Sequence, residues 1–434
     1  MKIRIILLGL ALYSTSIICA QEKTLQWDLT TCINYALQNN IQIQKSKISL
    51  EQNGIDLKLA KAQLFPNLSA TVGQNLSNNP FNSTTNYTGS YNISSAMTLF
   101  DGGKTLKNIE QQKLTQQVGN YAVLEASKNI QMSILQTYLQ ILYADESVKI
   151  NKATVDVSEY QVKRAQQLLQ AGSISKTDLA QLESQFSSDK YQMVVSENSL
   201  RTYKLQLKQL LELSANEEIN INIPELNSLD VLKSLPALSY IYETSLSVMP
   251  QIKSSRTELQ IAELETDKAK TAYLPKVSLN ANIGSANGSG TGTGFSEQIK
   301  NNWGNVVGVS VSIPVFTKRE NKSAVEKARL SEKTSQLALQ TTEKDLLKEI
   351  ESVFQEALSA QSQYVAALEK EKALKISYEL VEQQFNLGMK NTLDLLTEKN
   401  NLLAAQQSLV QAKYMSLLNA QLLNLYQDLP LEIK

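Results

Sequence analysis

Two parts of the chain alternate apolar and small polar residues, and this period of two predicts β-strands with one apolar face. The alternation is visible at residues 68–72 in the first half of the chain, and at 277–283 and 307–313 in the second half. Residues 97–100 match 313–316 and supply the partner strand of the first half. The pattern therefore predicts two strand pairs, or four strands in the whole chain.

The segments between the paired strands, about 74–86 and 285–302, are rich in asparagine, glycine, serine and threonine. This composition is typical of loops that reverse the direction of the chain. The glycines from Gly288 to Gly294 are not followed by the lysine of a phosphate-binding P-loop, and we expect no helix to begin there. We therefore expect two hairpin loops and no nucleotide site.

Two long segments, 103–170 and 319–386, carry apolar residues at helical spacing and contain no proline. A helix of this length would reach about 100 Å at about 1.5 Å per residue. Such a helix does not fit inside an ordinary globular domain, so it must pack lengthwise against other helices. Gly172 and Gly388 interrupt the two helices, and returning helices are predicted from residue 176 and residue 392. Each long segment is therefore half of a helical hairpin.

Shorter helices, about 29–63 and 238–272, precede the strands and end before Pro66 and Pro275, because the residue before a proline disfavours helical geometry. The two prolines are 209 positions apart, whereas Gly172 and Gly388 are 216 positions apart, as are the first-turn residues Asp178 and Asp394. Both halves therefore have the same order of elements, which indicates a tandem duplication. We divide the chain into these segments: signal peptide 1–20, first repeat 21–213, linker 214–237, second repeat 238–428 and tail 429–434.

The amino terminus has the features of an export signal. Lys2 and Arg4 precede an apolar stretch from Ile5 to Leu12, and small residues end the segment before Gln21. Cys19 raises the alternative of a lipoprotein, but the isoleucine before it is larger than such signals prefer, so we favour cleavage after Ala20. No later segment has 18 consecutive apolar residues, so we expect no transmembrane helix.

Composition excludes several functional classes. The chain has no histidine, which excludes Ser-His-Asp and Cys-His catalysis and histidine metal sites. Its 42 basic and 42 acidic residues show no basic excess, so we expect no nucleic-acid partner. Two cysteines cannot form a cysteine-rich zinc site, and Cys32 is expected to be a buried helical residue. We therefore expect neither an enzyme nor a bound cofactor or metal.

Four strands leave two open sheet edges, and open edges are not tolerated in lipid because their backbone groups would lack hydrogen-bond partners. If the strands enter a membrane, several chains must close one barrel. Two chains would supply eight strands and three would supply twelve, and the residues themselves do not choose between these numbers.

Several motifs carry a resemblance to a known family. They are Ala36–Asn40, Phe65–Ser69, Leu99–Gly103, Ala171–Asp178 and Leu387–Asp394. On these motifs the chain resembles outer-membrane efflux proteins of the TolC family over essentially the whole length after residue 20. The resemblance implies a mixed α and β membrane protein that forms a homotrimer. Its helical hairpins would build an α-barrel in the periplasm of a Gram-negative bacterium, and its strands a shared 12-stranded β-barrel in outer-membrane lipid.

The resemblance also implies the activity and the partners. Such proteins are exit ducts for drugs, toxins or proteins, and they work with a periplasmic adaptor and an inner-membrane transporter. They need no catalytic cofactor. Two other classes remain open from the residues alone. A periplasmic adaptor also has a long helical hairpin, although normally one rather than two. A secreted hydrolase with paired carboxylates would need a clustered acidic site, and the sequence shows none.

Site residues follow from the resemblance as well. The periplasmic gate would comprise Asp178, Phe385, Lys390 and Asp394. The adaptor would dock on hairpin-tip residues Gly172, Ser173, Ile174, Gly388 and Met389. Lys390 stands where the family archetype has arginine, Phe385 where it has tyrosine, and Thr397 where it has a second pore aspartate. We expect a contact between Asp178 and Lys390 that closes the entrance less firmly than arginine would.

Overall fold

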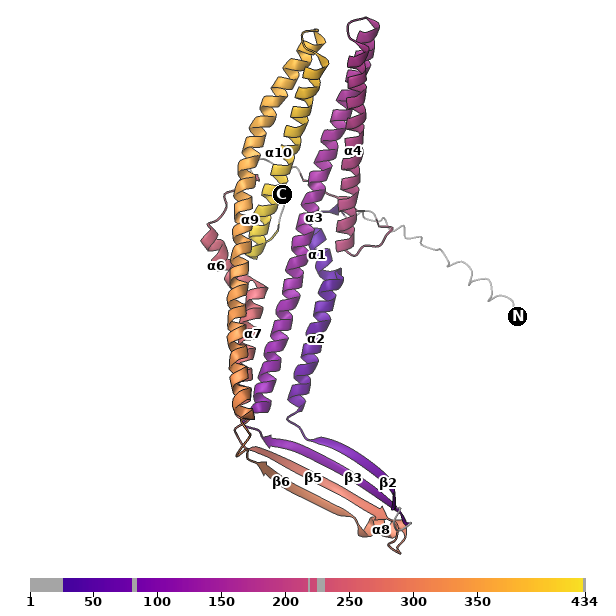
Figure 1. Cartoon of the computed structure of the whole chain (residues 1–434), viewed down its shortest axis with the longest axis vertical. Helices are drawn as coiled ribbons and strands as arrows, with labels where there is room; N and C mark the ends of the chain where they lie inside the picture. Colours follow the sequence, from indigo (N-terminus) through magenta and orange to yellow (C-terminus); the bar gives the residue numbers. More distant parts are fainter. Residues whose placement is uncertain (1–25, 80–83, 218, 225–230, 432–434) are drawn as a thin grey trace, which may run out of the picture.

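The computed structural model describes residues 26–79, 84–217, 219–224 and 231–431, so the expected signal peptide lies outside the described residues. The molecule is elongated, with a body of helices that run lengthwise and a sheet at one end (Figure 1). Both helical hairpins end at the opposite extremity (Figure 1). The mixed α and β fold that the sequence predicted is confirmed.

The long helices have the same length in both repeats. Helix α3 covers Lys104–Gln170 and α9 covers Glu320–Asn386, with 67 residues each. The returning helices α4, Lys176–Leu210, and α10, Thr392–Tyr426, have 35 residues each. Equal lengths of corresponding helices are expected from a tandem duplication. The two predicted hairpins are confirmed.

The predicted helices 29–63 and 238–272 are each interrupted once, which corrects the prediction of single helices. The first consists of α1, Leu29–Asn39, and α2, Ile41–Ala62, and the second of α6, Leu238–Val248, and α7, Pro250–Thr271. Asn40 has extended backbone geometry, and its side-chain oxygen accepts from the backbone N–H groups of Gln42 and Ile43 at the start of α2. A capping residue of this kind favours a new helix over continuation. In the second repeat a proline at the first position of α7 has the same effect.

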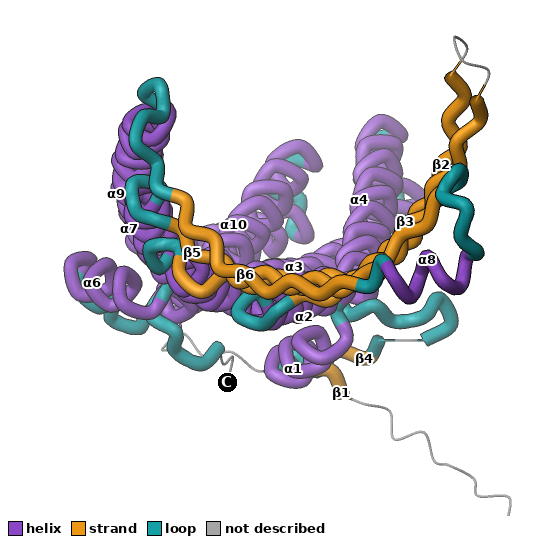
Figure 2. Tube along the Cα trace, turned by 90° about the horizontal axis from the view of Figure 1, so that it is seen from below, coloured by secondary structure: helices purple, strands orange, loops and turns teal. Residues whose placement is uncertain are grey.

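The four predicted strands form one antiparallel sheet in the order β2-β3-β5-β6. Their bounds are Asn67–Asn79 for β2, Thr84–Phe100 for β3, Lys276–Gly288 for β5 and Gly304–Ser312 for β6. The central pair β3–β5 joins the two repeats, while β2 and β6 are the edges. Seen along the helices, the strands form a curved layer (Figure 2).

The strands extend further than predicted, so the expected loops 74–86 and 285–302 are shorter in the structure. Strand β2 continues to Asn79, which pairs with Thr84 of β3. Within the second expected loop lies a short helix, α8, Phe295–Asn301, where we had predicted none. The Gln298 side chain fastens α8 to β5, because it accepts from the Gly288 N–H at 2.7 Å and donates to the Thr293 carbonyl at 2.8 Å. Tertiary hydrogen bonds therefore stabilise a helix that local composition disfavours.

The two faces of the sheet differ in polarity, as the alternation predicted. On one face Leu68, Val72 and Leu76 of β2 are 77%, 68% and 73% exposed. Leu279 pairs with Val309 on the same face. The opposite face carries asparagines and serines, and the four strands together contain a single charged residue, Lys276. A sheet with so many exposed apolar side chains is suited to an apolar environment on one side.

The buried core lies halfway along the helical body rather than in the sheet. One cluster joins α1, α3, α4 and α10 and includes Cys32, Ile134, Leu142 and Leu207, all with 0% exposure. Two short strands, β1 at Gln26–Trp27 and β4 at Asn220–Ile221, pair in parallel beside it. Burial raises the pKa of the Cys32 thiol to about 12, so this side chain is a neutral apolar group at neutral pH, as expected.

Candidate functional site

The two hairpin tips have the same turn geometry. At the end of α3, Gly172 has a positive φ of 72°, and the Ser173 N–H donates to the Leu168 carbonyl at 2.9 Å. At the end of α9, Gly388 has a φ of 74°, and the Met389 N–H donates to the Gln384 carbonyl at 2.9 Å. These bonds across five residues close a Schellman turn, which requires a left-handed residue and so favours glycine.

The side chains at the two tips differ in exposure. Met389 and Leu387 are 72% and 75% exposed, and Ser173 is also exposed. Ile174 instead packs against a small core of Val162, Ala165 and Leu182. Among the predicted docking residues, the apolar surface of the tips is therefore contributed by Met389, while Ile174 fastens the first tip to its own hairpin.

Asp178 belongs to the cap of α4. The Asp178 N–H donates to the Ser175 hydroxyl at 3.1 Å, and the Ser175 N–H donates to the Asp178 carboxylate at 3.1 Å, which forms a capping box. The Ser175 hydroxyl bond is the largest cause that lowers the pKa of Asp178 below its usual 3.8, followed by the nearby hydroxyl of Thr392. A lowered pKa means that the cap is stable at neutral pH and weakens only as the pH falls through that lowered value.

Thr392 belongs to the second hairpin and lies beside Asp178 of the first hairpin, so the two tips are neighbours in the structure. The Thr392 side chain is 1% exposed, and its hydroxyl lies toward Asp178 without a hydrogen bond of normal geometry to any described residue. In α10, the Asn391 side chain accepts from the Asp394 N–H at 2.8 Å, so Asp394 has the same first-turn place as Asp178. Both carboxylates lie where the helix dipole favours negative charge.

Lys390 contacts Asp394 of its own hairpin rather than Asp178. The Nζ atom of Lys390 is 3.6 Å from Asp394 Oδ2, and both side chains are about two-fifths exposed. Lys390 lies in the turn just before the cap of α10, close to Asp394 in the first turn of that helix, whereas Asp178 is already engaged by its own cap. Phe385 is half-buried beside the turn, and Thr397 bonds to the Leu393 carbonyl. Within one chain the expected Asp178–Lys390 contact does not form.

A buried polar cluster lies between the hairpins, and the sequence patterns did not predict it. Lys399 of α10 and Asp189 of α4 form an ion pair at 2.5 Å, with side chains only 5% and 4% exposed. Ser158 of α3 hydrogen-bonds with both of them, and the Gln185 amide donates to the other Asp189 oxygen at 2.8 Å. Three helices from two hairpins therefore meet at one fully engaged charge pair.

Further polar contacts join the two hairpins on either side of this cluster. They are Gln161–Tyr378 at 3.2 Å, Gln185–Asn400 at 3.3 Å, Gln407–Asn151 at 3.1 Å and Lys413–Glu146 at 3.3 Å. The repeat alignment offers a signal for the buried cluster: at the 216-residue offset Asp189 corresponds to Ala405, and Lys399 to Glu183. The charges at both positions therefore differ between the repeats, so this contact has no counterpart in the other repeat.

A sequence model of the outer membrane efflux protein family matches residues 32–212 and 241–427. The chain belongs to this family. The two matched segments correspond to the two repeats. Outer membrane efflux protein BepC of Brucella suis is 20% identical over 415 residues, which cover 94% of this chain and 87% of BepC. Outer membrane protein TolC of Escherichia coli is 21% identical, with 96% and 84% covered.

Solved structures show the same fold. The structure of CusC matches with a TM-score of 0.82 and 19% identity, covering 93% of this chain and 92% of CusC. The CmeC outer membrane channel of Campylobacter jejuni matches with a TM-score of 0.76 and 19% identity, covering 94% and 87%. The protein is thus an outer-membrane efflux duct rather than an enzyme, with a large periplasmic portion. Among its described helices, none combines the length and apolar character that crossing a membrane would require.

The buried cluster generates a stability prediction. Lys399→Met leaves Asp189 as an uncompensated buried charge, so we expect the free energy of unfolding to fall by about 3–5 kcal/mol. The double variant Lys399→Met/Asp189→Leu should recover most of this loss, because both charges are then absent. Thermal and denaturant unfolding of the detergent-solubilised protein would measure the effect.

Lys390→Met provides the matched control, since it removes one partner of an exposed ion pair in the same hairpin. We expect this control to change the unfolding free energy by at most about 1 kcal/mol. If Lys399→Met behaves like the control, the buried pair does not hold the two hairpins together.

Proposed function

We propose that three copies of the chain form one continuous channel, through which drugs, toxins or proteins pass from the periplasm to the exterior. The observation that carries this proposal is the open sheet continuous with long helices. Strands β2 and β6 have free edges, and the chain continues from the sheet directly into the helical body. In lipid those edges need strand partners, and another copy of the same sheet can provide them.

The helices beside the free edges support the same assembly. In the lower half of Figure 1 the helices follow in the order α9, α7, α3, α2, so α2 and α9 lie on opposite sides. On α2, Ile41, Ile48 and Ile55 are spaced by seven residues and are 50%, 56% and 62% exposed. On α9, Leu330 and Leu337 are also seven residues apart, and are 66% and 55% exposed.

Apolar residues repeating every seven positions form the seam of a coiled coil. The α2 stripe of one copy can therefore pack against the α9 stripe of the next, while β2 pairs with β6 of that neighbour. Three copies would close a barrel of twelve strands, whereas two copies would give eight strands, which are filled by side chains and leave little lumen.

We propose further that a periplasmic adaptor docks on the two tips and links the channel to an inner-membrane transporter. Gly172, Ser173, Gly388 and Met389 would form the docking surface, with Ile174 supporting the first tip from inside. A Cβ atom at Gly172 or Gly388 would meet no atom within 4 Å. The space beside both glycines is therefore available to a partner.

The gate is proposed to comprise Asp178, Phe385, Lys390 and Asp394 at the periplasmic entrance. Within one chain Lys390 neutralises Asp394, which limits negative charge at the pore. In the trimer Lys390 would also approach Asp178 of an adjacent hairpin. Each exposed pair contributes only about 0–1 kcal/mol, but threefold repetition makes the total sufficient to bias most channels toward closure.

Assembly can be tested at the α2 seam. In Ile48→Asp/Ile55→Asp each copy would bury two unpaired charges, so we expect monomers where the unaltered protein forms trimers. The mass of the protein in detergent, by light scattering, measures the change. Tyr240→Asp is the control, because this side chain of α6 is 60% exposed and lies outside the stripe. An unaltered protein that is monomeric would contradict the proposed channel.

Docking at the tips can be tested by substituting two glycines that have similar backbone geometry, one at a tip and one at the sheet. We expect Gly388→Leu to abolish efflux while trimers persist, because the added side chain occupies the docking surface without meeting its own chain. The left-handed backbone adds a local cost of about 1–2 kcal/mol. Gly290→Leu is the matched control: its φ is 84°, no atom lies within 4 Å, and it is at the sheet end. Drug susceptibility of cells that depend on this channel should rise only for Gly388→Leu.

Charge reversal can distinguish the two possible partners of Lys390 in the proposed gate, Asp178 and Asp394. Lys390→Glu sets like charges beside Asp394, so we expect higher conductance in planar bilayers and entry of large antibiotics. If Asp178→Lys then restores closure, the gate contact runs between hairpins. If only Asp394→Lys restores it, the relevant pair is the local one. Conductance that does not respond to Lys390→Glu would mean that these charges are solvated caps.

A further inference from the structure

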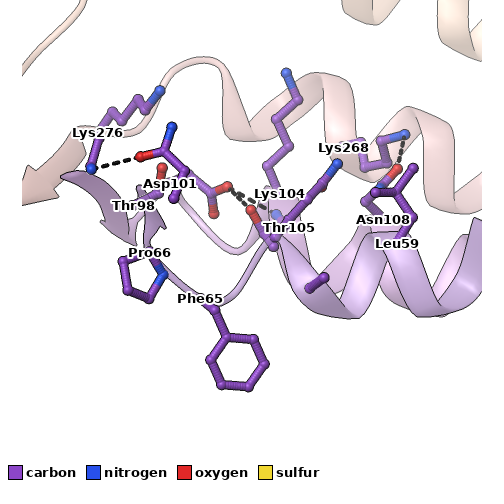
Figure 3. Close-up of a pocket in the computed structure, with 14 residues that line it drawn as sticks. Leu59, Phe65, Pro66, Thr98, Asp101, Lys104, Thr105, Asn108, Lys268 and Lys276 are labelled. Atoms are coloured by element: carbon purple, nitrogen blue, oxygen red, sulfur yellow. Dashed lines mark hydrogen bonds between the residues drawn. The ribbon is translucent and has the colours of Figure 1, made fainter. Parts of the chain in front are cut away.

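A cavity of about 750 Å³ lies where the strands meet the helices (Figure 3). Residues from α2, α3, α7 and three strands line it, so it spans both repeats. Three of the lining residues are lysines, Lys104, Lys268 and Lys276, and one is acidic, Asp101. We call this cavity the neck site.

Of the three lysines of the neck site, only Lys268 has an acidic partner among the described residues. Lys268 is mostly buried, and it donates to Gln111 at 2.6 Å and to Glu265 at 2.9 Å. Lys104 and Lys276 are exposed, and neither has an acidic partner within 4.0 Å among the described residues. The Asp101 carboxylate accepts from the Thr105 N–H at 2.9 Å and from its hydroxyl at 2.5 Å, so it caps α3. Two amino groups therefore remain available to a ligand.

The strand register shows which side of the sheet the neck site occupies. Asn67 pairs with Ala96, and Ala96 pairs with Asn280, so the lining residues Asn67 and Ala96 share the polar face with Asn280. Lys276 is four positions before Asn280 and shares that face by the period of two. In Figure 3 the amino groups of Lys104 and Lys276 point to one side, while the ring of Phe65 points to the other.

Lys276 is the single charged residue of the four strands, so no carboxylate on the polar face opposes the cations. Apolar residues face the other side of the sheet, where lipid would be. In the proposed channel the polar face is the interior. The neck site would then repeat three times around the passage, between an uncharged barrel wall and the helices.

We propose that the neck site binds carboxylate or phosphate groups of anionic cargo as it enters the barrel. This inference rests on the proposed channel function and assigns a substrate class to it. Lysines around a pore select anions, because low-dielectric walls concentrate their field in the passage. The strands beyond the neck site carry no further charged residue, so the barrel would hold no second anion site that could retain the cargo.

The test uses the full-length protein in planar bilayers of neutral lipid, with citrate as the probe. Lys104→Gln/Lys276→Gln is compared with the control Lys61→Gln/Lys318→Gln. The control removes the same charge from exposed lysines of the same junction that do not line the cavity. Channel block by citrate and the anion-to-cation permeability ratio in a KCl gradient are measured.

We expect the half-blocking citrate concentration to rise about three- to tenfold in the neck variant and to stay unchanged in the control, which is the effect of losing two exposed ion contacts. The permeability ratio should shift toward cations in the neck variant alone. Equal behaviour of the two variants in conducting channels would overturn the neck site and leave the channel function intact. Absence of conductance from every protein, the unaltered one included, would overturn the channel function instead.

A second measurement tests binding without conductance. In detergent, citrate should protect Lys104 and Lys276 from acetylation by an amine-reactive reagent, with Lys61 and Lys318 as internal references. Mass spectrometry would report at least about a threefold slower modification for the two neck lysines. If all four lysines react at the same rate with and without citrate, the site does not bind small anions. Protection only by anionic lipid vesicles would likewise refute it, by placing the lysines on the lipid side.

Discussion

The unpaired backbone groups at the edges of a four-stranded sheet determine most of this architecture. One face of the sheet is apolar, so the strands are suited to lipid, yet β2 and β6 each leave a row of N–H and C=O groups without partners. In hydrocarbon an unsatisfied group costs several kcal/mol, which no side-chain contact could offset along a whole strand. In the proposed channel, further copies of the chain would supply these partners. The heptad-spaced stripes on α2 and α9 lie beside the same edges, so helices and strands can close together.

Duplication explains the symmetry of the fold, and the departures from symmetry are where the two halves interact. Helices α3 and α9 have equal lengths, but Ser158, Asp189 and Lys399 correspond to Leu374, Ala405 and Glu183 in the other repeat. Their contact can therefore form only once per chain. At the sheet junction Gly102 and Gly103 have left-handed backbones, whereas the second repeat places Lys318 and Arg319 in the same region. The turn is preserved although the residue that normally favours it is not.

Much of the fold could be predicted, because alternation with period two, helical spacing, prolines and turn glycines are local signals. The break at Met249 had such a signal in Pro250, and Asn40 resembles a cap, so both breaks could have been recognised. Helix α8 could not, because it is held by hydrogen bonds between the Gln298 side chain and the backbone of Gly288 and Thr293, outside the helix. The proposed gate residues were selected by motif, but the partner of Lys390 depends on competition among nearby carboxylates. The buried Lys399–Asp189 pair arises from packing between hairpins, which local patterns do not encode.

The strength of the polar contacts differs along the hairpins, and this difference bears on how an entrance could open. Lys399 lies seven residues into α10, or about 10 Å from its start. There the two hairpins share a buried charge pair, and the loss of one partner is expected to cost about 3–5 kcal/mol because the other charge would stay buried and unpaired. At the tips the Lys390–Asp394 pair is exposed and contributes about 0–1 kcal/mol. Thermal energy or a docked partner can therefore rearrange the last turns much more readily than it can separate the hairpins. Movement confined to the tips would leave the sheet and its edges undisturbed, so in the proposed channel the entrance could change while the barrel stays closed to lipid.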